Sequence, residues 1–366
     1  MPHKIRSILT WMIIIFNILE IIIMFLIGNI YKLNPTEYPK LSNIGLVFPI
    51  LLILNIIFLI LWICIDIKKI WIPILGFILS YQPIRTYIPF NITKECPKKS
   101  LKILTYNVYL FANWDFPNLN NNPIVKYIVN SKADIVCLQE TRLNKDDFKI
   151  VYEAFKKVYP YIIVTSMPEP GCQHMTMLSK YKIIDHKQIK YKSAGNISMA
   201  YTIDYKGKNI EIINNHFESN HLSPEDKQEY KSLVTQPFIG NNAKQESLNL
   251  LNKLSEASKI RAPQVDKVTE YIKYCKKLKM PIILCGDFND SPISYTRYKI
   301  SKELTDCYVA AGNGPGFSYH RSGIYVRIDN TFCSNEFIPY KSKVDNQINA
   351  SDHYPLITWL KYQPNR

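Results

Sequence analysis

Apolar residues are unevenly distributed along the 366-residue chain, and their pattern divides it into two parts. The first part contains long apolar runs at residues 8–30, 44–65 and 70–90. The first two runs have the length that a helix needs to cross a bilayer. No small-residue cleavage site follows the first run, which favours a membrane span over a removable signal peptide. The third run is interrupted by Gln82, Arg85 and prolines, so it either crosses the bilayer or lies in the interface.

Charged residues beside these runs predict their orientation. Lys4 and Arg6 precede the first run, and Lys68 and Lys69 follow the second. Lys and Arg favour the cytoplasmic side, so the first two runs form a hairpin whose ends both face the cytoplasm. If the run 70–90 crosses the bilayer as well, the remainder of the chain lies outside the cytoplasm, and this is the arrangement we expect. If that run only lies in the interface, the remainder is cytoplasmic. The predicted location is the cell membrane, with several crossings.

The remainder alternates short β-rich runs with amphipathic helical patterns, which is typical of an α/β architecture. We expect residues 1–90 to form a membrane anchor, 91–100 a linker and 101–366 a separate folded domain. Pro263 is expected to separate two helices. Strands are predicted at 101–108, 134–139, 161–164, 175–178, 183–184, 199–204, 209–214, 282–285 and 325–332, and helices at 122–131, 145–158, 223–230, 243–260 and 264–278.

Charge and cysteine content narrow the function classes. The formal net charge is +15, of which +6 falls in residues 1–99 and +9 in the remainder. A basic soluble part suits an anionic partner, although a Lys-rich composition alone also produces such a charge. The eight cysteines include no Cys-x-x-Cys pair, which argues against a zinc knuckle or a redox motif.

Asn17, Glu20 and Asn55 lie inside the apolar runs, where we expect interhelical hydrogen bonds rather than a transport path.

Polar residues stand where predicted strands end. The run 282–285 stops at Gly286, and Asp287 and Asn289 follow on the same side of an extended chain. Carboxylate, amide and imidazole groups at the ends of several strands are expected to converge on one edge of an α/β fold. Oxygen ligands of this kind suit Mg²⁺. The candidate residues are Asn107, Glu140, His216, Asp287, Asn289, Asp329, Asp352 and His353.

These segments resemble the endonuclease/exonuclease/phosphatase (DNase I-like) superfamily, which includes nucleases, neutral sphingomyelinases and inositol-phosphate phosphatases. The resemblance implies a four-layer sandwich of two mostly antiparallel sheets flanked by helices. With the N-terminal apolar runs, the chain is similar to membrane-attached bacterial members. Gly171 together with Leu178-Ser179-Lys180-Tyr181 also fits the middle strand of the family. The matching motifs, in the order of the family, are Thr-Tyr-Asn-Val (105–108), Leu-Gln-Glu-Thr (138–141), Asn-His-Phe-Glu-Ser (215–219), Gly-Asp-Phe-Asn-Asp (286–290), Arg-Ile-Asp (327–329) and Ser-Asp-His (351–353).

The resemblance also implies a metal site. Glu140 corresponds to the main Mg²⁺ ligand, with Asn107 and Asp352 nearby, and Mn²⁺ is expected to substitute for Mg²⁺. Many nucleases of the family carry an acid two residues after the Asn, where this chain has Tyr109. A second metal position is therefore in doubt.

The remaining motif residues correspond to the catalytic groups of the family. Asp287 is expected to orient or deprotonate the attacking water, and Asn289 and His216 to hold the oxygens of the scissile phosphate. His353 is expected to pair with Asp329, which fixes the tautomer of the imidazole and raises its basicity. Either His353 or Asp287 can take the proton.

The expected function is therefore that of a membrane-anchored, Mg²⁺-dependent phosphoesterase acting on phosphodiester or phosphomonoester bonds. Its substrate is nucleic acid or a lipid headgroup, and no protein partner is predicted. Arg261 and the lysines near it can meet phosphates, although a solvated helix face explains them more simply. The alternative function is a binding module at the membrane that keeps the fold and has lost the chemistry.

Overall fold

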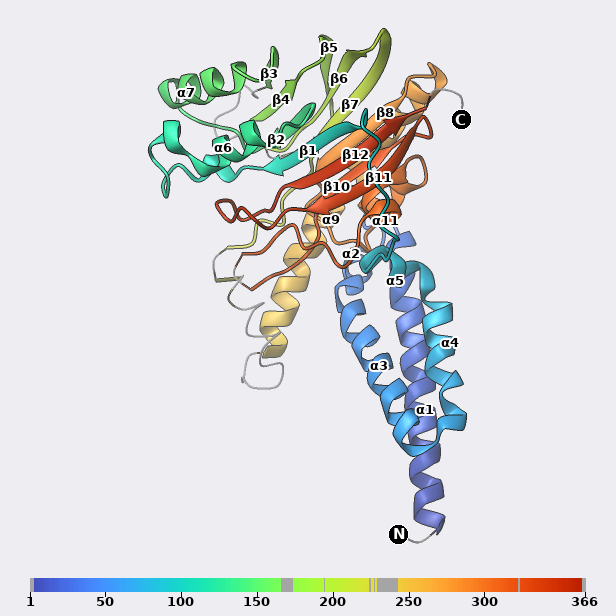
Figure 1. Cartoon of the computed structure of the whole chain (residues 1–366). Helices are drawn as coiled ribbons and strands as arrows, with labels where there is room; N and C mark the ends of the chain where they lie inside the picture. Colours follow the sequence, from blue (N-terminus) through green and yellow to red (C-terminus); the bar gives the residue numbers. More distant parts are fainter. Residues whose placement is uncertain are drawn as a thin grey trace.

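Two six-stranded sheets pack face to face, helices cover their outer faces, and a helical bundle projects from one end (Figure 1). This arrangement confirms the predicted α/β sandwich. The computed structural model describes residues 3–165, 174–193, 195–223, 225–226, 228, 243–321 and 323–363. Half of the helix predicted at 223–230, and also Gly171, lie outside these residues.

The first sheet has the strand order β11-β12-β1-β2-β4-β3. Within it, only β1 and β2 run parallel, and all other neighbours are antiparallel. The strands are β1 (Leu101–Asn107), β2 (Ile135–Gln139), β3 (Tyr161–Thr165), β4 (Met175–Ser179), β11 (Phe337–Val344) and β12 (Leu356–Tyr362).

The second sheet has the order β5-β6-β7-β8-β10-β9, and again one central pair, β7 and β8, is parallel. The two sheets thus share one plan, with a parallel pair at the centre and antiparallel strands on both sides. The strands are β5 (Ile183–Ile189), β6 (Ser198–Tyr205), β7 (Lys208–His216), β8 (Ile282–Asp287), β9 (Thr305–Asp306) and β10 (Asp329–Cys333).

The main core lies between the sheets, where alternate residues of facing strands meet. Ile103, Cys137, Tyr201 and Cys285 are fully buried there. The free cysteines of this layer act as small apolar side chains. Helices α6 (Pro123–Asn130) and α7 (Lys145–Lys156) cover the first sheet, and α9 (Ala243–Lys277) covers the second. The short helices α10 (Tyr295–Ser301) and α11 (Cys307–Ala311) lie between β8 and β10 in the chain.

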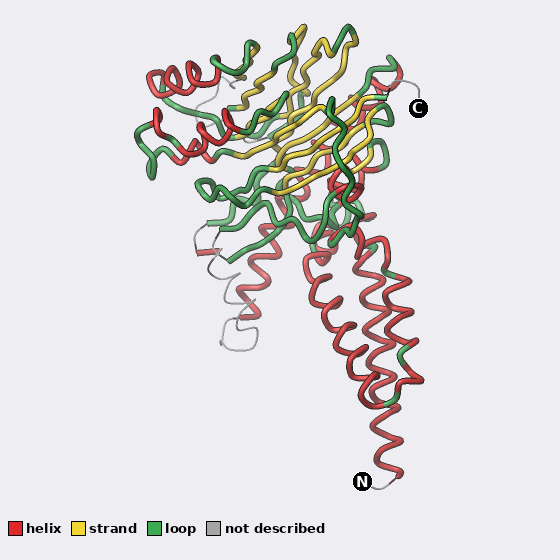
Figure 2. Tube along the Cα trace, viewed as in Figure 1, coloured by secondary structure: helices red, strands yellow, loops and turns green. Residues whose placement is uncertain are grey.

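The N-terminal part of the chain forms a bundle of helices (Figure 2). Most of the large apolar side chains of these helices are exposed. Among the described residues, the segments Arg6–Lys32 and Pro39–Ile65 are long and apolar enough to cross a membrane. Of an apolar 18-residue stretch within each segment, only 28% and 22% is buried. Such segments suit membrane spans or, near an N-terminus, a signal sequence. The helices are α1 (His3–Gly28), α2 (Pro39–Ser42), α3 (Phe48–Ile65), α4 (Trp71–Leu79) and α5 (Tyr81–Tyr87).

Two of the three polar side chains inside the bundle join its helices, as expected from the sequence, whereas the buried carboxylate oxygens of Glu20 have no hydrogen-bond partner among the described residues. Trp62 donates its indole N–H to the Asn17 side chain at 3.0 Å, and Asn55 donates to the carbonyl of Pro73 at 3.0 Å. The third apolar run forms α4 and α5, which are separated at Ser80 rather than joined in one helix. Helix α4 packs against α1 and α3, so the run belongs to the same bundle.

Two predicted elements differ from the structure. Pro263 does not break the helix, because α9 continues through it from Ala243 to Lys277. Val265 and Val268 pack against the face of the second sheet that points away from the first sheet. Their burial offsets the ~3 kcal/mol that a proline inside a helix costs. The strand predicted at 325–332 begins only at Asp329, because the preceding backbone bonds elsewhere. The Ser318 hydroxyl accepts the N–H groups of Ile328 and Asp329, at 3.0 Å each.

Candidate active site

The predicted site residues stand at one rim of the sandwich because of the strand directions. Asn107 and Glu140 come at the carboxyl ends of the parallel strands β1 and β2, and His216 and Asp287 at those of β7 and β8. Carboxyl ends of parallel strands share one edge of a sheet. Asp329, the first residue of β10, pairs directly with Asp287 in the antiparallel ladder.

The amide of Asn107 links residues from both sheets. It donates to Glu140 Oε1 at 3.0 Å and to Asp287 Oδ2 at 3.1 Å. His216 Nε2 lies 3.6 Å from the same Glu140 oxygen and 3.8 Å from the same Asp287 oxygen. The buried Nδ1 of His216 has no hydrogen-bond partner within the described residues. The rim therefore has an imidazole that is close to two carboxylates and is not committed to either.

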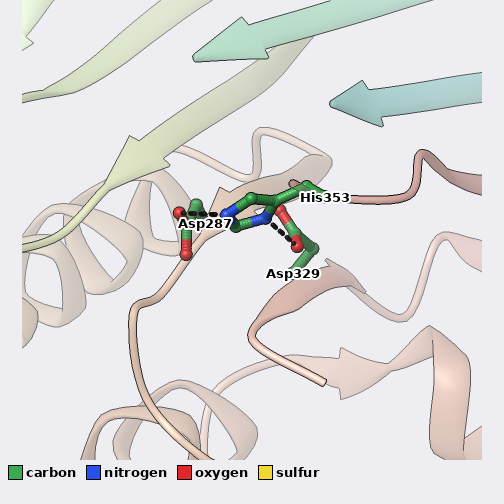
Figure 3. Close-up of side chains that lie close together, drawn as sticks. All are labelled: Asp287, Asp329 and His353. Atoms are coloured by element: carbon green, nitrogen blue, oxygen red, sulfur yellow. Dashed lines mark hydrogen bonds and ion pairs between the residues drawn. The ribbon is translucent and has the colours of Figure 1, made fainter. Parts of the chain in front are cut away.

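His353 lies between two aspartates (Figure 3). Its Nδ1 is 2.8 Å from Asp329 Oδ2, and its Nε2 is 3.7 Å from Asp287 Oδ2. One ligand atom from each of the three residues lies within 4.8 Å of the others, a spacing that could hold a metal ion. Because Nδ1 is engaged by Asp329, the trio resembles a hydrogen-bonded carboxylate–imidazole pair beside a second carboxylate more than a set of metal ligands.

Burial and charge act in opposite directions on these groups. Burial alone lowers the pKa of His353, but the charges of Asp329 and Asp287 outweigh it and raise that pKa to about 10. Burial raises the pKa of Asp287, while the charge of His353 acts against this rise. Burial lowers the pKa of His216. At neutral pH the site thus combines a protonated His353, a neutral His216 and a carboxylate of increased basicity.

The backbone at the rim adopts left-handed conformations that ordinary residues avoid. Four consecutive residues after β1, Tyr109 to Ala112, have φ between 45° and 58°, and Glu140 and Asn289 have φ of 55° and 51°. Each such residue costs ~1–2 kcal/mol. The N–H of Leu110 donates to the Glu140 carbonyl at 2.9 Å, so the left-handed turn and Glu140 support each other. Strain of this kind concentrates at functional sites.

Asn289 and Asp352 occupy the edges of this group. The backbone N–H of Asn289 donates to Asp287 Oδ1 at 2.8 Å, and its side-chain amide donates to the Phe217 carbonyl at 2.9 Å. An amide nitrogen carries two hydrogens, so a second donor remains for a ligand. The carboxylate of Asp352 lies 4.0 Å from the Arg321 guanidinium.

Several supporting residues were missed in the sequence. Gln139 donates to the Asn214 side chain at 2.7 Å and thereby ties the two sheets together behind the rim. Tyr319 packs the edge of its ring against His353, with centroids 5.2 Å apart. Gln139 and Asn214 are polar residues inside otherwise apolar strands, and this pattern could have identified them as supporting residues. No feature of the sequence around Tyr319 indicated its role.

Arg261 does not belong to a solvated helix face, contrary to the simpler interpretation of the sequence. It is almost fully buried and donates to the carbonyl of Glu218 at 2.9 Å and to the side chain of Asn220 at 2.8 Å. Its Nε lies 3.6 Å from Asp290. Arg261 therefore supports the two loops that follow His216 and Asp287. The exposed Lys259 and Lys267, in contrast, pair with neighbouring glutamates on the helix surface.

The chain belongs to the endonuclease/exonuclease/phosphatase family, whose sequence profile matches residues 104–353. The resemblance inferred from the motifs is thereby confirmed. Members of this family are generally hydrolases of phosphoester bonds and typically depend on a divalent metal. Residues 9–87 match a second family, described as a domain of unknown function (DUF8431). No curated protein matches the sequence.

Solved structures with a similar fold cover nearly three quarters of the chain. The catalytic domain of human Nocturnin with a bound sulfate anion has a TM-score of 0.52 at 15% identity, covering 72% of this chain and 94% of that one. Truncated TDP2 from Caenorhabditis elegans has a TM-score of 0.51 at 15% identity, covering 73% and 99%. TDP2 from D. rerio, complexed with a single-strand DNA product, has a TM-score of 0.50 at 14% identity, covering 72% and 100%. At these identities the likeness concerns the fold alone.

Proposed function

We propose that this protein is a membrane-anchored phosphoesterase that uses a divalent metal, Mg²⁺ with Mn²⁺ as a substitute, to hydrolyse phosphodiester bonds. The observation that carries the proposal is the convergence of Glu140, His216 and His353 around Asp287. One oxygen of Asp287 accepts a hydrogen bond from Asn107 and lies within 4 Å of both imidazoles. Charged groups brought together at a rim of strained backbone suit catalysis better than folding stability.

The chemistry of the donors fits a hard cation. Glu140 and Asp352 offer carboxylate oxygens, and the amide oxygen of Asn107, which accepts the Tyr109 N–H at 3.1 Å, keeps a second lone pair. No thiol of the described residues takes part. We assign these three residues as the metal ligands. A divalent cation held there would neutralise charge on the phosphate oxygens, which is the usual contribution of Mg²⁺ in phosphoryl transfer.

The catalytic roles follow from the protonation states of the side chains. Asp287 is proposed to take the proton of the attacking water, since burial raises its pKa and makes it a better base. His353 is proposed to hold a phosphate oxygen as an imidazolium, kept charged by Asp329. His216 and the free amide hydrogen of Asn289 donate to the other oxygens. Together they stabilise the charge that develops as the phosphodiester bond breaks.

The activity test uses the purified full-length protein in detergent with Mg²⁺ and bis-p-nitrophenyl phosphate. Glu140→Ala and His353→Ala are expected to lower turnover by at least ~10²-fold, which is the usual size of losses at charge-stabilising groups. His186→Ala, at an exposed position of β5, is the matched control and is expected to retain turnover. Equal turnover in all four proteins would support the inactive binding module instead.

Either nucleic acid or a phospholipid-type diester fits the proposed chemistry. The similar fold of D. rerio TDP2 carries a DNA product, which supports the first class, and the apolar bundle supports the second. Plasmid DNA, RNA, a sphingomyelin-like lipid and inositol phosphates, compared under one Mg²⁺ condition, separate these classes.

We further propose that residues 1–90 anchor the chain, 91–100 link it, and 101–366 form an extracytoplasmic catalytic domain. The N-terminus and the turn between α3 and α4 lie at the end of the bundle far from the sheets (Figure 1). Arg6, Lys68 and Lys69 mark that end as cytoplasmic by the positive-inside rule. A periplasm-specific reporter fused after Arg366 is expected to be active; activity of a cytoplasm-specific reporter instead would refute this topology.

A further inference from the structure

The end of helix α5 is bonded to a residue that lies two positions before Asp329. This helix closes the bundle at the end nearest the sheets (Figure 1). Arg327, which is almost fully buried, donates to the carbonyls of Thr86 and Tyr87 in the last turn of α5. It also donates to the Pro315 carbonyl at 2.6 Å. Burying a charge is costly unless its hydrogen bonds are made, so these carbonyls fix the position of Arg327.

From Arg327 the chain runs directly into the candidate active site. The carbonyl of Ile328 accepts the N–H of Phe288 at 2.9 Å, which fixes this segment to the end of β8. Asp329, the first residue of β10, then places its carboxylate 2.8 Å from His353 Nδ1. Because one residue separates Arg327 from Asp329, a shift of the guanidinium is transmitted to the carboxylate through the backbone.

A second connection between the bundle and the site begins just after α5. The side-chain amide of Asn91 donates to the carbonyls of Val309 at 3.1 Å and Gly312 at 2.6 Å. The Pro89 carbonyl accepts the N–H of Gly314 at 2.9 Å. The end of the bundle therefore holds α11 and the beginning of the loop that follows it.

The other end of this loop contacts the same aspartate–histidine pair. The Ser318 hydroxyl accepts the N–H of Asp329 at 3.0 Å, and the Ser318 carbonyl accepts the N–H of Tyr354 at 2.6 Å. Tyr319 forms an isolated β-bridge with His353. Two hydrogen-bonded routes, one through Arg327 and one through this loop, thus lead from the bundle to Asp329 and His353.

We infer that the end of the bundle positions Asp329 through Arg327, so that hydrolysis requires the bundle to be folded against the catalytic domain. The inference rests on the proposed function and adds the regulation of its site. Arg327 is a positioning residue, since it acts on the imidazole only through Asp329. Because the helices of the bundle expose apolar side chains, the bundle assembles in a membrane or a detergent micelle. Hydrolysis is thereby restricted to the membrane-bound chain.

The first test is Arg327→Lys in the full-length protein in detergent, with bis-p-nitrophenyl phosphate and saturating Mg²⁺. Lysine keeps the charge, but its ammonium group cannot replace the planar guanidinium toward three carbonyls. We expect kcat, expressed per molecule that is folded by circular dichroism, to fall by at least ~10-fold, since small misplacements of catalytic groups cost up to about 10²-fold.

Asp329→Ala separates positioning from any other role of Arg327. This variant removes the carboxylate that Arg327 is inferred to position. In its presence, Arg327→Lys is therefore expected to lower kcat by less than about twofold, because residues that act through one another have non-additive effects. A loss by the same factor in both backgrounds overturns the inference.

Asn91→Ala tests the bundle side and also replaces Arg327→Lys if that variant does not fold. It removes the hydrogen bonds to Val309 and Gly312 and leaves all predicted site residues in place. We expect kcat to fall by roughly two- to tenfold, the size of the effect of one lost hydrogen bond. Lys94→Ala, at an exposed position of the same segment, is the control and is expected to keep the wild-type kcat.

The outcomes distinguish this inference from the proposed function. Wild-type kcat in either Asn91→Ala or folded Arg327→Lys overturns the role of the bundle and leaves the phosphoesterase in place. A wild-type protein without turnover overturns both. Losses in both variants, with the loss in Arg327→Lys abolished by Asp329→Ala, support the inference.

Discussion

Asp329→Asn tests the charge arrangement of the site most directly. The carboxylate of Asp329 lies 2.8 Å from His353 Nδ1, and its charge is the main influence that raises the pKa of His353 against the effect of burial. Asparagine keeps an oxygen that accepts the Nδ1–H and therefore preserves the tautomer, but it removes the charge. The substitution thus isolates the electrostatic contribution from the orienting one.

The magnitude follows from the pKa of about 10 for His353. Loss of a neighbouring charge shifts a pKa by about 1–3 units, so that the variant has a pKa of about 7–8 if the loss is two units or more. At pH 9 about nine tenths of the wild-type imidazole is then protonated, compared with about one hundredth to one tenth in the variant. If the imidazolium holds the phosphate, kcat/KM falls by about 10- to 100-fold at pH 9 and by much less at pH 6.

The assay is a kcat/KM profile between pH 6 and pH 9.5 with bis-p-nitrophenyl phosphate and saturating Mg²⁺. The control is Asp185→Asn, at an exposed position of β5, which is expected to keep the wild-type profile. A variant profile that runs parallel to that of the wild type, however low, would refute the reasoning, because Asp329 would then not govern the charge of His353.

Three further predictions concern the metal ligand Glu140, the contact of Arg327 with the end of helix α5, and Gly286 at the rim. Glu140→Gln is expected to raise the Mg²⁺ concentration for half-maximal activity by at least ~10-fold, because the main ligand loses its charge; an unchanged Mg²⁺ titration would contradict this assignment. Arg327→Met removes the hydrogen bonds that the Arg327 guanidinium donates to the carbonyls of Thr86, Tyr87 and Pro315. At about 1–3 kcal/mol for each of these three hydrogen bonds from a charged donor, we expect the free energy of unfolding to fall by about 3–9 kcal/mol, with Arg327→Lys intermediate, measured by denaturation of the full chain in detergent. Gly286→Ala places a Cβ atom against the backbone carbonyl oxygen of Asn215 at φ +130°, so we expect the free energy of unfolding to fall by about 2–5 kcal/mol in the same assay. Wild-type stability would show that the backbone relaxes freely.

Much of the fold could be predicted because local patterns and tertiary packing agree. Buried strands such as β2 and β8 are apolar runs that end at a polar residue, and this signal does not depend on what they pack against. The helix through Pro263 could not be predicted, because its continuity depends on Val265 and Val268 packing against a distant sheet. The late start of β10 likewise depends on Ser318, whose hydroxyl accepts two backbone N–H groups that a local pattern assigns to a strand.

The sequence by itself determined the choice of candidate site residues, since several stand where an apolar run stops and all belong to motifs that match the family, and it determined the two-part character of the chain. Tertiary structure alone decided how these residues meet. The amide of Asn107 reaches carboxylates from both sheets, and His353 lies between aspartates of two neighbouring strands. It also decided that Arg261 is buried. These contacts join residues tens to hundreds of positions apart, and their geometry depends on strand register and helix packing, which no local pattern encodes.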